Sequence, residues 1–319
     1  MKRSFYLITG FIMLFALMSS CSSEHEAPIR VGTNTWPGYE PGYIAEASHF
    51  YGDADIRMRQ FTSATEVLRA FRSEAIDVAA LTLDEVLLLA QDGLDIAVIF
   101  VTDISAGADV IVARPELTSV TDLKDKRIAV ENTALGAYVL ARALEIYNVD
   151  PVTVTPIPIT VDESSLVFEH NRADAVVTFD PYRTALLAQG AIEIFSSAEM
   201  PGEIVDVLVT RRSTIANHEK SLQLMVEGWL KAIDTINQKS KKTQQIIAKR
   251  TGLEADDVYG LFEGLELPDK LANYEMLAGE HPMLSHTIDR LAELLIQQGL
   301  ITNTLPGADI IDGFALEEE

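Results

Sequence analysis

Carboxylates are the side chains of this sequence whose type and spacing could do chemistry. Nine of them fall in six short segments that follow predicted β-strands, and these segments contain no lysine or arginine. The nine are Glu40, Asp84, Glu85, Asp103, Asp109, Glu131, Asp180, Glu203 and Asp206. Unpaired carboxylates repel an anion and favour a cation. We therefore expect a site for a small cationic or neutral nitrogen-containing molecule, such as an amine, a guanidinium-like compound or a pyrimidine.

Four aromatic side chains in the same segments could add a second attraction. Trp36, Tyr39, Phe179 and Tyr182 can present ring faces to a cation. The local excess of acids is modest, because the whole chain has 48 acidic and 25 basic residues. A sulfonate or nitrate held by backbone N–H groups at helix N-termini is therefore the alternative ligand.

The acidic segments separate elements that alternate as strand, loop and helix. The first set has predicted strands at residues 29–32, 56–61, 77–81 and 96–101, with helices at 43–50, 64–73 and 83–91. The second set has strands at 110–113, 127–130, 175–178 and 192–195, an extended segment at 152–156, and helices at 136–147, 162–168 and from 181 onward. A strand at 204–210 leaves the second set, and helices follow at 222–236, 241–249, 255–261 and 285–298. This alternation predicts parallel sheets covered by helices.

Two sets of elements predict an α/β fold with two lobes, each a mainly parallel sheet flanked by helices, and a helical C-terminal region. We expect residues 29–104 and 211–319 in lobe 1, and residues 105–210 in lobe 2. Ligands of open α/β sheets bind beyond the carboxyl ends of the strands. The candidate ligand-binding residues are therefore Asn34, Trp36, Tyr39, Thr82, Asp84, Asp109, Thr133, Leu135, Gly136, Asp180 and Asp206.

Several candidates also have a purely structural interpretation. Thr82 could cap the helix that begins beside it, and Asp180 before a proline is a common N-cap arrangement. Trp36 could pack at a lobe surface. Thr133 and Gly136 open a helix whose free N–H groups can accept an anion or a carbonyl, with capping as the alternative.

Composition excludes several classes of protein. A net charge of −23 disfavours nucleic-acid binding, which needs basic patches. One cysteine cannot form an internal disulfide or a cysteine-built zinc site. The six histidines are scattered and form no HExxH pattern. We expect neither enzymatic activity nor a metal or other cofactor.

The N-terminus has the pattern of an export signal that contains the lone cysteine. A basic pair precedes an apolar run at residues 5–17, which is shorter than the ~20 residues that cross a bilayer as a helix. Small residues then precede Cys21, which is similar to the lipobox of bacterial lipoproteins, although Met18 stands where leucine is usual. We expect residues 1–20 to be a lipoprotein signal peptide, Cys21 to be acylated and residues 21–28 to be a tether. The alternative is ordinary secretion, with cleavage near Cys21 and a free thiol.

Four stretches of sequence together resemble a known family. They are GTNTWPGYEPGYIA (32–45), DISAGADVIVAR (103–114), LTSVTDLKDKRIAVENTALGAYVLARAL (117–144) and ADAVVTFDPYRTAL (173–186). In this order they resemble the nitrate/sulfonate/taurine/thiamine-precursor group of periplasmic binding proteins. The resemblance implies a type II periplasmic binding-protein fold that serves an ABC importer. It also implies that the lobes close on the ligand, whose polar head is held near Thr133 and Gly136.

The resemblance carries further expectations about partners and location. It implies a small-molecule ligand, permease subunits in the inner membrane, and a monomeric protein on the periplasmic side of the envelope, held to a membrane by its N-terminal lipid. A second interpretation of the function is a sensor that binds a ligand without taking part in transport. An enzyme like the related branch that makes the thiamine pyrimidine is a third, but this sequence lacks a histidine cluster or a second cysteine to support it.

Overall fold

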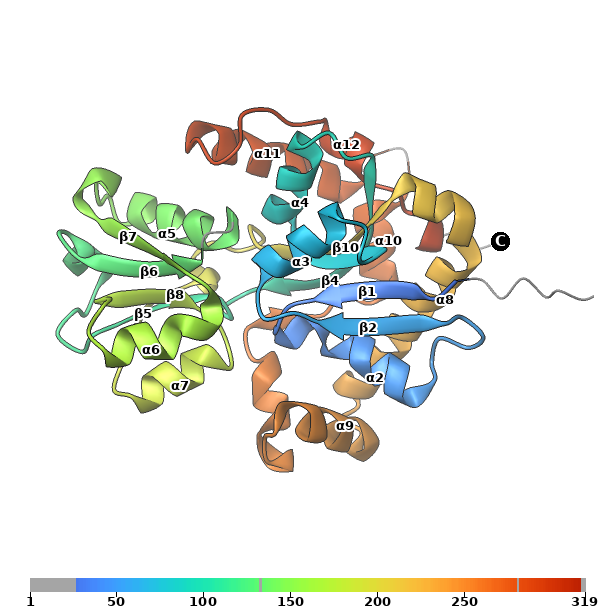
Figure 1. Cartoon of the computed structure of the whole chain (residues 1–319), viewed down its shortest axis with the longest axis horizontal. Coiled ribbons are helices and arrows are strands. Elements are labelled where there is room, and N and C mark those ends of the chain that lie inside the picture. The colour runs from blue at the N-terminus through green and yellow to red at the C-terminus, as the bar shows by residue number, and fades with distance from the viewer. Residues whose placement is uncertain (1–26, 132–133, 280, 317–319) are drawn as a thin grey trace, which may run out of the picture.

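Two lobes lie side by side in the computed structural model, which describes residues 27–131, 134–279 and 281–316 (Figure 1). Within this part of the chain, one lobe is built on a six-stranded sheet and the other on a five-stranded sheet. The predicted two-lobe α/β fold is confirmed. The predicted signal peptide, Cys21 and Thr133 lie outside the described residues. None of the described helices has the length and apolar character needed to span a bilayer.

The large lobe has the strand order β11-β4-β10-β3-β1-β2. Its strands are β1 (Ile29–Thr33), β2 (Ile56–Gln60), β3 (Val78–Thr82), β4 (Ile96–Ser105), β10 (Val205–Arg211) and β11 (Leu265–Glu266). Strands β1 to β4 run in one direction, and β10 and β11 run in the other. Helices α3 (Ala64–Arg72) and α4 (Leu83–Gln91) cover one face, whereas α2 (Glu40–Ser48) and α8 (Arg212–Asn237) cover the other (Figure 1). Strand β3 is buried along its whole length, because helices pack on both faces.

The small lobe has the strand order β7-β6-β8-β5-β9. Its strands are β5 (Val110–Ala113), β6 (Arg127–Glu131), β7 (Thr155–Ile159), β8 (Ala175–Thr178) and β9 (Ile192–Ser196). Only β5 runs against the other four. Helix α5 (Ala134–Ile146) lies on one face, and α6 (Ser164–Glu169) and α7 (Tyr182–Ala188) lie on the other (Figure 1).

Two segments cross between the lobes, at residues 105–109 and 196–204, and we call them together the hinge. The hydroxyl oxygens of Ser105 and Ser197 are 2.8 Å apart, and the N–H of Gly107 donates to Ser197 Oγ at 2.7 Å. The N–H of Ala106 donates to the carbonyl of Gly264 at 2.7 Å. These bonds tie both crossings to one another and to the large lobe at a single place.

The chain beyond β10 returns to the large lobe and is mostly helical. Its elements are α8, α9 (Lys241–Thr251), a 3₁₀ helix (Ala255–Phe262), α10 (Lys270–Leu277), α11 (Met283–Gln297) and α12 (Gly307–Ile310). The sequence did not predict β11, α10 or α12. Helix α10 docks through Asn273, whose amide accepts from the N–H of Val101 at 2.7 Å and donates to its carbonyl at 3.1 Å. The Asn273 side chain thus pairs with β4 as a neighbouring strand would.

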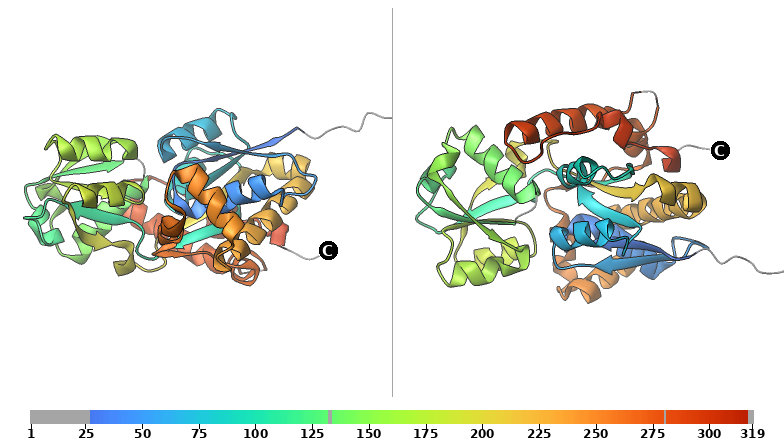
Figure 2. Two further views of the ribbon diagram at one scale, coloured as in Figure 1. Left: turned by 90° about the horizontal axis from the view of Figure 1, so that it is seen from below. Right: turned by 45° about the horizontal axis from the view of Figure 1, so that its top comes forward.

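Helix α11 extends from the large lobe over the junction with the small lobe (Figure 2). Its Arg290 forms an ion pair with Glu203 of the hinge at 3.1 Å. Glu203 also pairs with Arg142 of α5 at 2.7 Å and accepts a hydrogen bond from Tyr138 at 2.6 Å. The C-terminal region therefore contacts the hinge as well as the large lobe.

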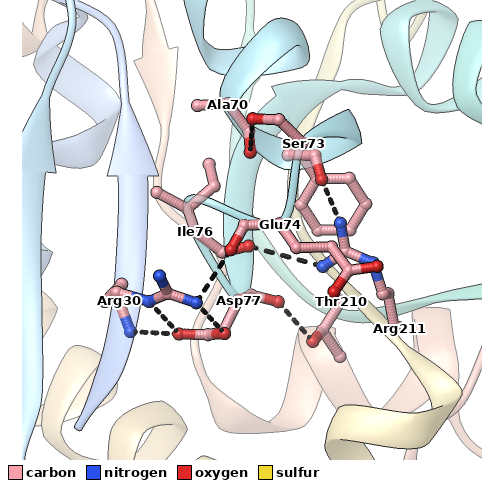
Figure 3. A network of polar contacts seen from close by, with 9 residues as sticks. Arg30, Ala70, Ser73, Glu74, Ile76, Asp77, Thr210 and Arg211 are labelled. Atoms are coloured by element: carbon pink, nitrogen blue, oxygen red, sulfur yellow. Dashed lines mark hydrogen bonds and ion pairs between the residues drawn. The ribbon is translucent and has the colours of Figure 1, made fainter.

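A polar network joins the start of β1 to the turn that enters β3 in the large-lobe sheet (Figure 3). Arg30 of β1 donates from its backbone N–H and its Nε to Asp77 Oδ2, at 2.9 and 2.8 Å. Its Nη2 donates to Asp77 Oδ1 at 2.7 Å and to the carbonyl of Glu74 at 2.9 Å. Thr210 donates to the Asp77 carbonyl at 2.7 Å. One arginine thereby fastens β1 to the turn that enters β3.

The small lobe repeats this network at the same sequence spacing. Arg127 of β6 donates from its N–H and Nε to Asp174 Oδ2 at 2.8 and 3.1 Å. Its Nη2 donates to Asp174 Oδ1 at 2.8 Å and to the carbonyl of Asn171 at 2.9 Å. The hydrogen bonds from Arg127 lower the pKa of Asp174. The partners are 47 residues apart in both lobes. The two lobes are therefore built on one repeated structural unit, which the sequence analysis did not detect.

The repeated network gives a matched pair of stability predictions. Asp77→Ala should lower the free energy of unfolding by about 2 kcal/mol, because it removes charge-assisted hydrogen bonds and leaves the Arg30 N–H unpaired. Asp174→Ala should have a similar effect in the other lobe. Urea denaturation followed by circular dichroism measures both. Asp92→Ala, which breaks an exposed pair with Arg72, is the control and should cost less than about 0.5 kcal/mol. Equal effects of all three variants would refute a structural role for the network.

Candidate ligand-binding site

A cavity lies between the lobes, where β1, β3, β6 and β8 all end. The space between its walls is about 530 Å³, open solvent at the mouth included. The large lobe lines it with Asn34, Trp36, Tyr39, Ala64, Thr82, Glu85 and Asp206. The small lobe and the hinge line it with Asp109, Glu131, Leu135, Gly136, Val139, Val161, Val177, Thr178 and Phe179.

The lobes touch each other across this cavity. The rings of Trp36 and Phe179 meet edge to face, with centroids 5.1 Å apart and an angle of 88° between their planes. Thr65 of α3 donates from its hydroxyl to Glu131 at the end of β6, at 3.4 Å. The walls of the cavity are therefore closed on each other, in the way that hinge closure encloses a ligand.

Eight of the predicted ligand-binding residues line the cavity. They are Asn34, Trp36, Tyr39, Thr82, Asp109, Leu135, Gly136 and Asp206. The structure brings them together from segments that are far apart in sequence. This agreement concerns their position, and their contact with a ligand remains a prediction.

Asp84 and Asp180 do not line the cavity. Asp84 is buried in the first turn of α4, and burial raises its pKa to about 6. Asp180 accepts from the N–H and hydroxyl of Thr184 at 3.1 and 2.6 Å. Its carboxylate therefore accepts from the first turn of α7, but the N-cap residue of α7 is Pro181, one position later than the structural interpretation placed it.

Several lining residues were absent from the predicted set. Glu85, Glu131 and Phe179 lay in the acidic or aromatic post-strand segments, so the signal that could have found them was present. Val139 follows Leu135 by one helical turn on α5, a spacing that places both on one face of a helix. Val161 and Val177 carried no signal that separates a cavity wall from an ordinary core residue.

Two buried acids and a threonine form one row across three neighbouring strands of the large-lobe sheet, and we call it the acid row. Asp206 of β10 lies opposite Thr82 of β3 on one side and opposite Asp103 of β4 on the other. A β-bulge beside Asp206 shifts the pairing with β4, and bulges commonly re-aim side chains next to functional sites. Like charges directly opposite one another in a sheet are destabilising. The folded protein is therefore more stable when at least one carboxyl of this row is protonated or when a cation lies nearby.

Burial and mutual repulsion raise the pKa values of the carboxyls around the cavity. Burial raises the pKa of Asp103, Asp109 and Glu131 to about 7 in each case. The pKa of Asp206 is raised well above its usual value by burial and then by the charge of Asp103. Burial and the charge of Asp84 do the same to Glu85. Negative charge at this site is costly in the absence of a counter-charge.

Two hydrogen bonds connect the acid row to the aromatic side chains. The indole N–H of Trp36 donates to Asp103 Oδ1 at 3.0 Å, and the Tyr39 hydroxyl donates to Asp206 Oδ1. A Cβ on Gly38 would lie 2.0 Å from Asp103 Oδ2, so only glycine lets the loop approach this closely. Asp103 thus orients the Trp36 ring, although Asp103 itself does not line the cavity.

Five oxygen atoms of cavity-lining residues are buried and have no hydrogen-bond partner within the described protein. They belong to Thr82 (Oγ1), Glu85 (Oε1), Asp109 (Oδ2), Thr178 (Oγ1) and Asp206 (Oδ2). Buried polar atoms are normally satisfied, and exceptions require an explanation. No three described His, Cys, Asp or Glu side chains are placed to hold a metal ion.

The small lobe adds the start of α5 to the cavity wall. A Cβ on Gly136 would lie 2.8 Å from the carbonyl oxygen of Glu131. A side chain at this position would push α5 away from the end of β6. The glycine therefore sets the distance between the first turn of α5 and Glu131.

Comparison with known proteins agrees with this fold. The taurine-binding periplasmic protein of Escherichia coli is 21% identical over 70% of this chain and 74% of its own. A putative aliphatic sulfonates-binding protein of the same organism is 22% identical over 78% of this chain and 79% of its own. The solved structure of the alkanesulfonate-binding protein SsuA from Xanthomonas axonopodis pv. citri, bound to MOPS, covers 90% of this chain and 98% of its own, with a TM-score of 0.77 and 17% identity.

The two lobes and the cavity between them define a type II periplasmic binding-protein fold. The family model of the NMT1-like family matches residues 22–252. The chain belongs to the NMT1-like family. The resemblance to the nitrate/sulfonate/taurine/thiamine-precursor group of ABC substrate-binding proteins is thereby confirmed.

The raised carboxyl pKa values predict that stability falls as pH rises. Between about pH 4 and pH 7 the folded state binds more protons than the unfolded state, so the free energy of unfolding decreases with rising pH. We expect the melting temperature, without added ligand, to fall by roughly 5–10 °C between pH 5.5 and pH 8. Differential scanning calorimetry measures this change.

Two variants test the assignment of this effect to the cavity. Asp206→Asn should reduce the fall, because an amide carries no charge at either pH. Asp53→Asn removes an exposed acid that does not line the cavity and should leave the fall unchanged. A melting temperature that stays constant or rises between pH 5.5 and pH 8 would contradict the raised pKa values.

Proposed function

We propose that this protein is the solute-binding receptor of an ABC importer and captures a small cationic or neutral nitrogen-containing molecule between its lobes. The observation that carries the ligand class is the lining of the cavity. Four of the lining side chains are carboxylates, namely Glu85, Asp109, Glu131 and Asp206, and none is a lysine or arginine. A cation would neutralise the repulsion within the acid row and thereby stabilise the closed lobes.

The transport part of the proposal is supported by the family and by the named relatives. The hinge lets the lobes separate to admit a molecule and then enclose it. Capture and release require no proton transfer or nucleophile, so we propose binding without catalysis. The receptor would then dock on permease subunits in the inner membrane and deliver the molecule.

The envelope location is part of the same proposal. The relatives are periplasmic proteins, and the residues before β1 have the pattern of a lipoprotein signal. We propose that Cys21 is acylated and holds a monomeric receptor on the periplasmic side of a membrane. Metabolic labelling with a fatty acid, and its loss in Cys21→Ser, tests the anchor.

A sulfonate is the alternative ligand, because the relatives are named for taurine and aliphatic sulfonates. The first turn of α5 and the amide of Asn34 are the donors that could hold an anion in this cavity. A sulfonate there would face carboxylates without a compensating basic side chain among the lining residues. We therefore favour the nitrogen-containing ligand.

Trp36 provides an optical test of the ligand class. The chain has two tryptophans, and Trp229 is buried in the large-lobe core, so a ligand in the cavity should change mainly the emission of Trp36. We expect amines, guanidinium compounds or aminopyrimidines to change the fluorescence of the protein lacking residues 1–21. Trp36→Phe should abolish the signal. A response to taurine, alkanesulfonates or nitrate alone would establish the alternative.

The affinity for the responding compound should depend on the carboxylates and on pH. Asp109→Asn should weaken binding by about tenfold or more, because it removes one buried negative charge from the wall. Affinity should increase from pH 5.5 to pH 8 as the carboxyls lose their protons. Isothermal titration calorimetry measures both effects. Asp53→Asn, at an exposed position that does not line the cavity, is the control and should bind like the unmodified protein. Tighter binding at pH 5.5 would argue for an anionic ligand.

A further inference from the structure

We propose that the ligand has a head group with three or more N–H donors, a primary ammonium or a guanidinium, attached to an apolar body. This inference rests on the proposed function and specifies the ligand of the same cavity. It distinguishes a hydrogen-bonding cation from a quaternary ammonium, which carries the same charge and has no N–H group.

The unpartnered oxygens indicate a head group that donates hydrogen bonds. Five residues are each at most 3% exposed, line the cavity and leave one oxygen without a partner in the described protein, namely Thr82, Glu85, Asp109, Thr178 and Asp206. Each of these oxygens can accept a hydrogen bond. A quaternary ammonium would leave all five unpaired, whereas a primary ammonium has donors for three of them and an alkylguanidinium has donors for all five.

Two of the carboxylates, those of Glu85 and Asp206, are held so that one oxygen is used by the protein and the other remains for the ligand. Glu85 Oε2 accepts from the N–H of Thr82 at 3.2 Å, which leaves Oε1. Asp206 Oδ1 accepts from the Tyr39 hydroxyl, which leaves Oδ2. The backbone of Asp109 is fixed by the hinge, because its N–H donates to Ser105 Oγ at 3.2 Å. The free acceptors are therefore pre-organised, which strengthens binding of a donor group that fits them.

The remaining wall indicates an apolar body. Most of the small-lobe lining is aliphatic or aromatic, namely Leu135, Val139, Val161, Val177 and Phe179. Burying hydrocarbon against this wall is favourable and demands no further donor. The acceptors and the apolar wall form two parts of one cavity, so the ligand should combine a polar head with an apolar remainder.

The aromatic residues do not form a cage for a quaternary ammonium. Trp36 and Phe179 meet edge to face, and Phe179 meets Tyr182 in the same way at 5.9 Å. The Tyr39 hydroxyl is bonded to Asp206. These rings pack on one another instead of turning several faces toward one point, as cation–π recognition of a methylated ammonium requires.

A series of four-carbon probes with different head groups tests the proposal. Butylamine, butylguanidine, butyltrimethylammonium, 1-butanol and 1-butanesulfonate share one apolar body. Isothermal titration calorimetry at pH 8 should show butylamine or butylguanidine binding about tenfold or more tightly than butyltrimethylammonium and 1-butanol. Methylamine should bind more weakly than butylamine, because it lacks the apolar body.

The outcomes separate the two proposals. Equal affinity for butyltrimethylammonium and butylamine would overturn the donor-bearing head and leave the cation receptor intact. Methylamine binding as tightly as butylamine would overturn the apolar body. Binding of 1-butanesulfonate alone would overturn the cation receptor itself. Failure of every amine and guanidine probe to bind at millimolar concentration would overturn this inference.

A single hydroxyl provides an uncharged test of the same contact. Thr178→Val keeps the shape of the side chain and removes one acceptor. It should weaken butylamine or butylguanidine binding about threefold or more and leave butyltrimethylammonium unaffected. Thr121→Val, at an exposed position of the small lobe, is the matched control and should change neither. Equal weakening of the primary and quaternary probes in Thr178→Val would assign Thr178 a structural role instead.

Discussion

The buried row of Thr82, Asp206 and Asp103 is the constraint on which the rest of the cavity depends. Strand register places the two carboxyls opposite each other on neighbouring strands, in a sheet that excludes water. The protein compensates in part with the indole of Trp36 and the hydroxyl of Tyr39, which donate to this row. The first post-strand loop is thus held in place by the same acids that a ligand would neutralise. The charge of the acids, the conformation of this loop and the shape of the cavity therefore depend on one another.

The repeated unit explains how two lobes of different sequence present one continuous site. Arg30 with Asp77 and Arg127 with Asp174 fix equivalent ends of the two sheets. Counted from these anchors, Asn34 corresponds to Glu131, and Thr82 corresponds to Phe179. All four residues line the cavity. The framework is therefore repeated, whereas the side chains differ, so one wall carries most of the hydrogen-bonding groups and the other is largely apolar.

Sequence patterns predicted much of the fold because most elements have clear periodicity, and several helices are followed within two residues by a glycine with positive φ, as α4, α9 and α11 are. The bounds of β5 and β8 agree with the predicted segments 110–113 and 175–178. Strand β4 continues beyond its predicted end at residue 101, because pairing with β10 and β11 extends it. That pairing is a tertiary property, and it makes Asp103 a sheet residue instead of a loop residue.

The site was harder to predict than the fold, because neighbouring residues on a helix point about 100° apart. The sequence places Asp84 and Glu85 together at the start of α4, but the packing of α4 decides that Glu85 faces the cavity. The same holds for Asp180, whose carboxylate turns to the N-terminus of α7. Composition and position in the sequence identify the acidic segments. Which acid of each segment faces the cavity depends on how the helices pack.

The acids of this site lie close to the pivot of the molecule. Asp103 and Asp109 flank the first crossing segment, and Asp206 follows the second. Electrostatic repulsion among them acts near the axis of rotation, where the lever arm is short. A displacement of a fraction of an ångström there translates into a much larger movement at the tips of the lobes. In the receptor proposed above, a shift caused by charge neutralisation at this point would therefore become a larger movement at the tips of the lobes.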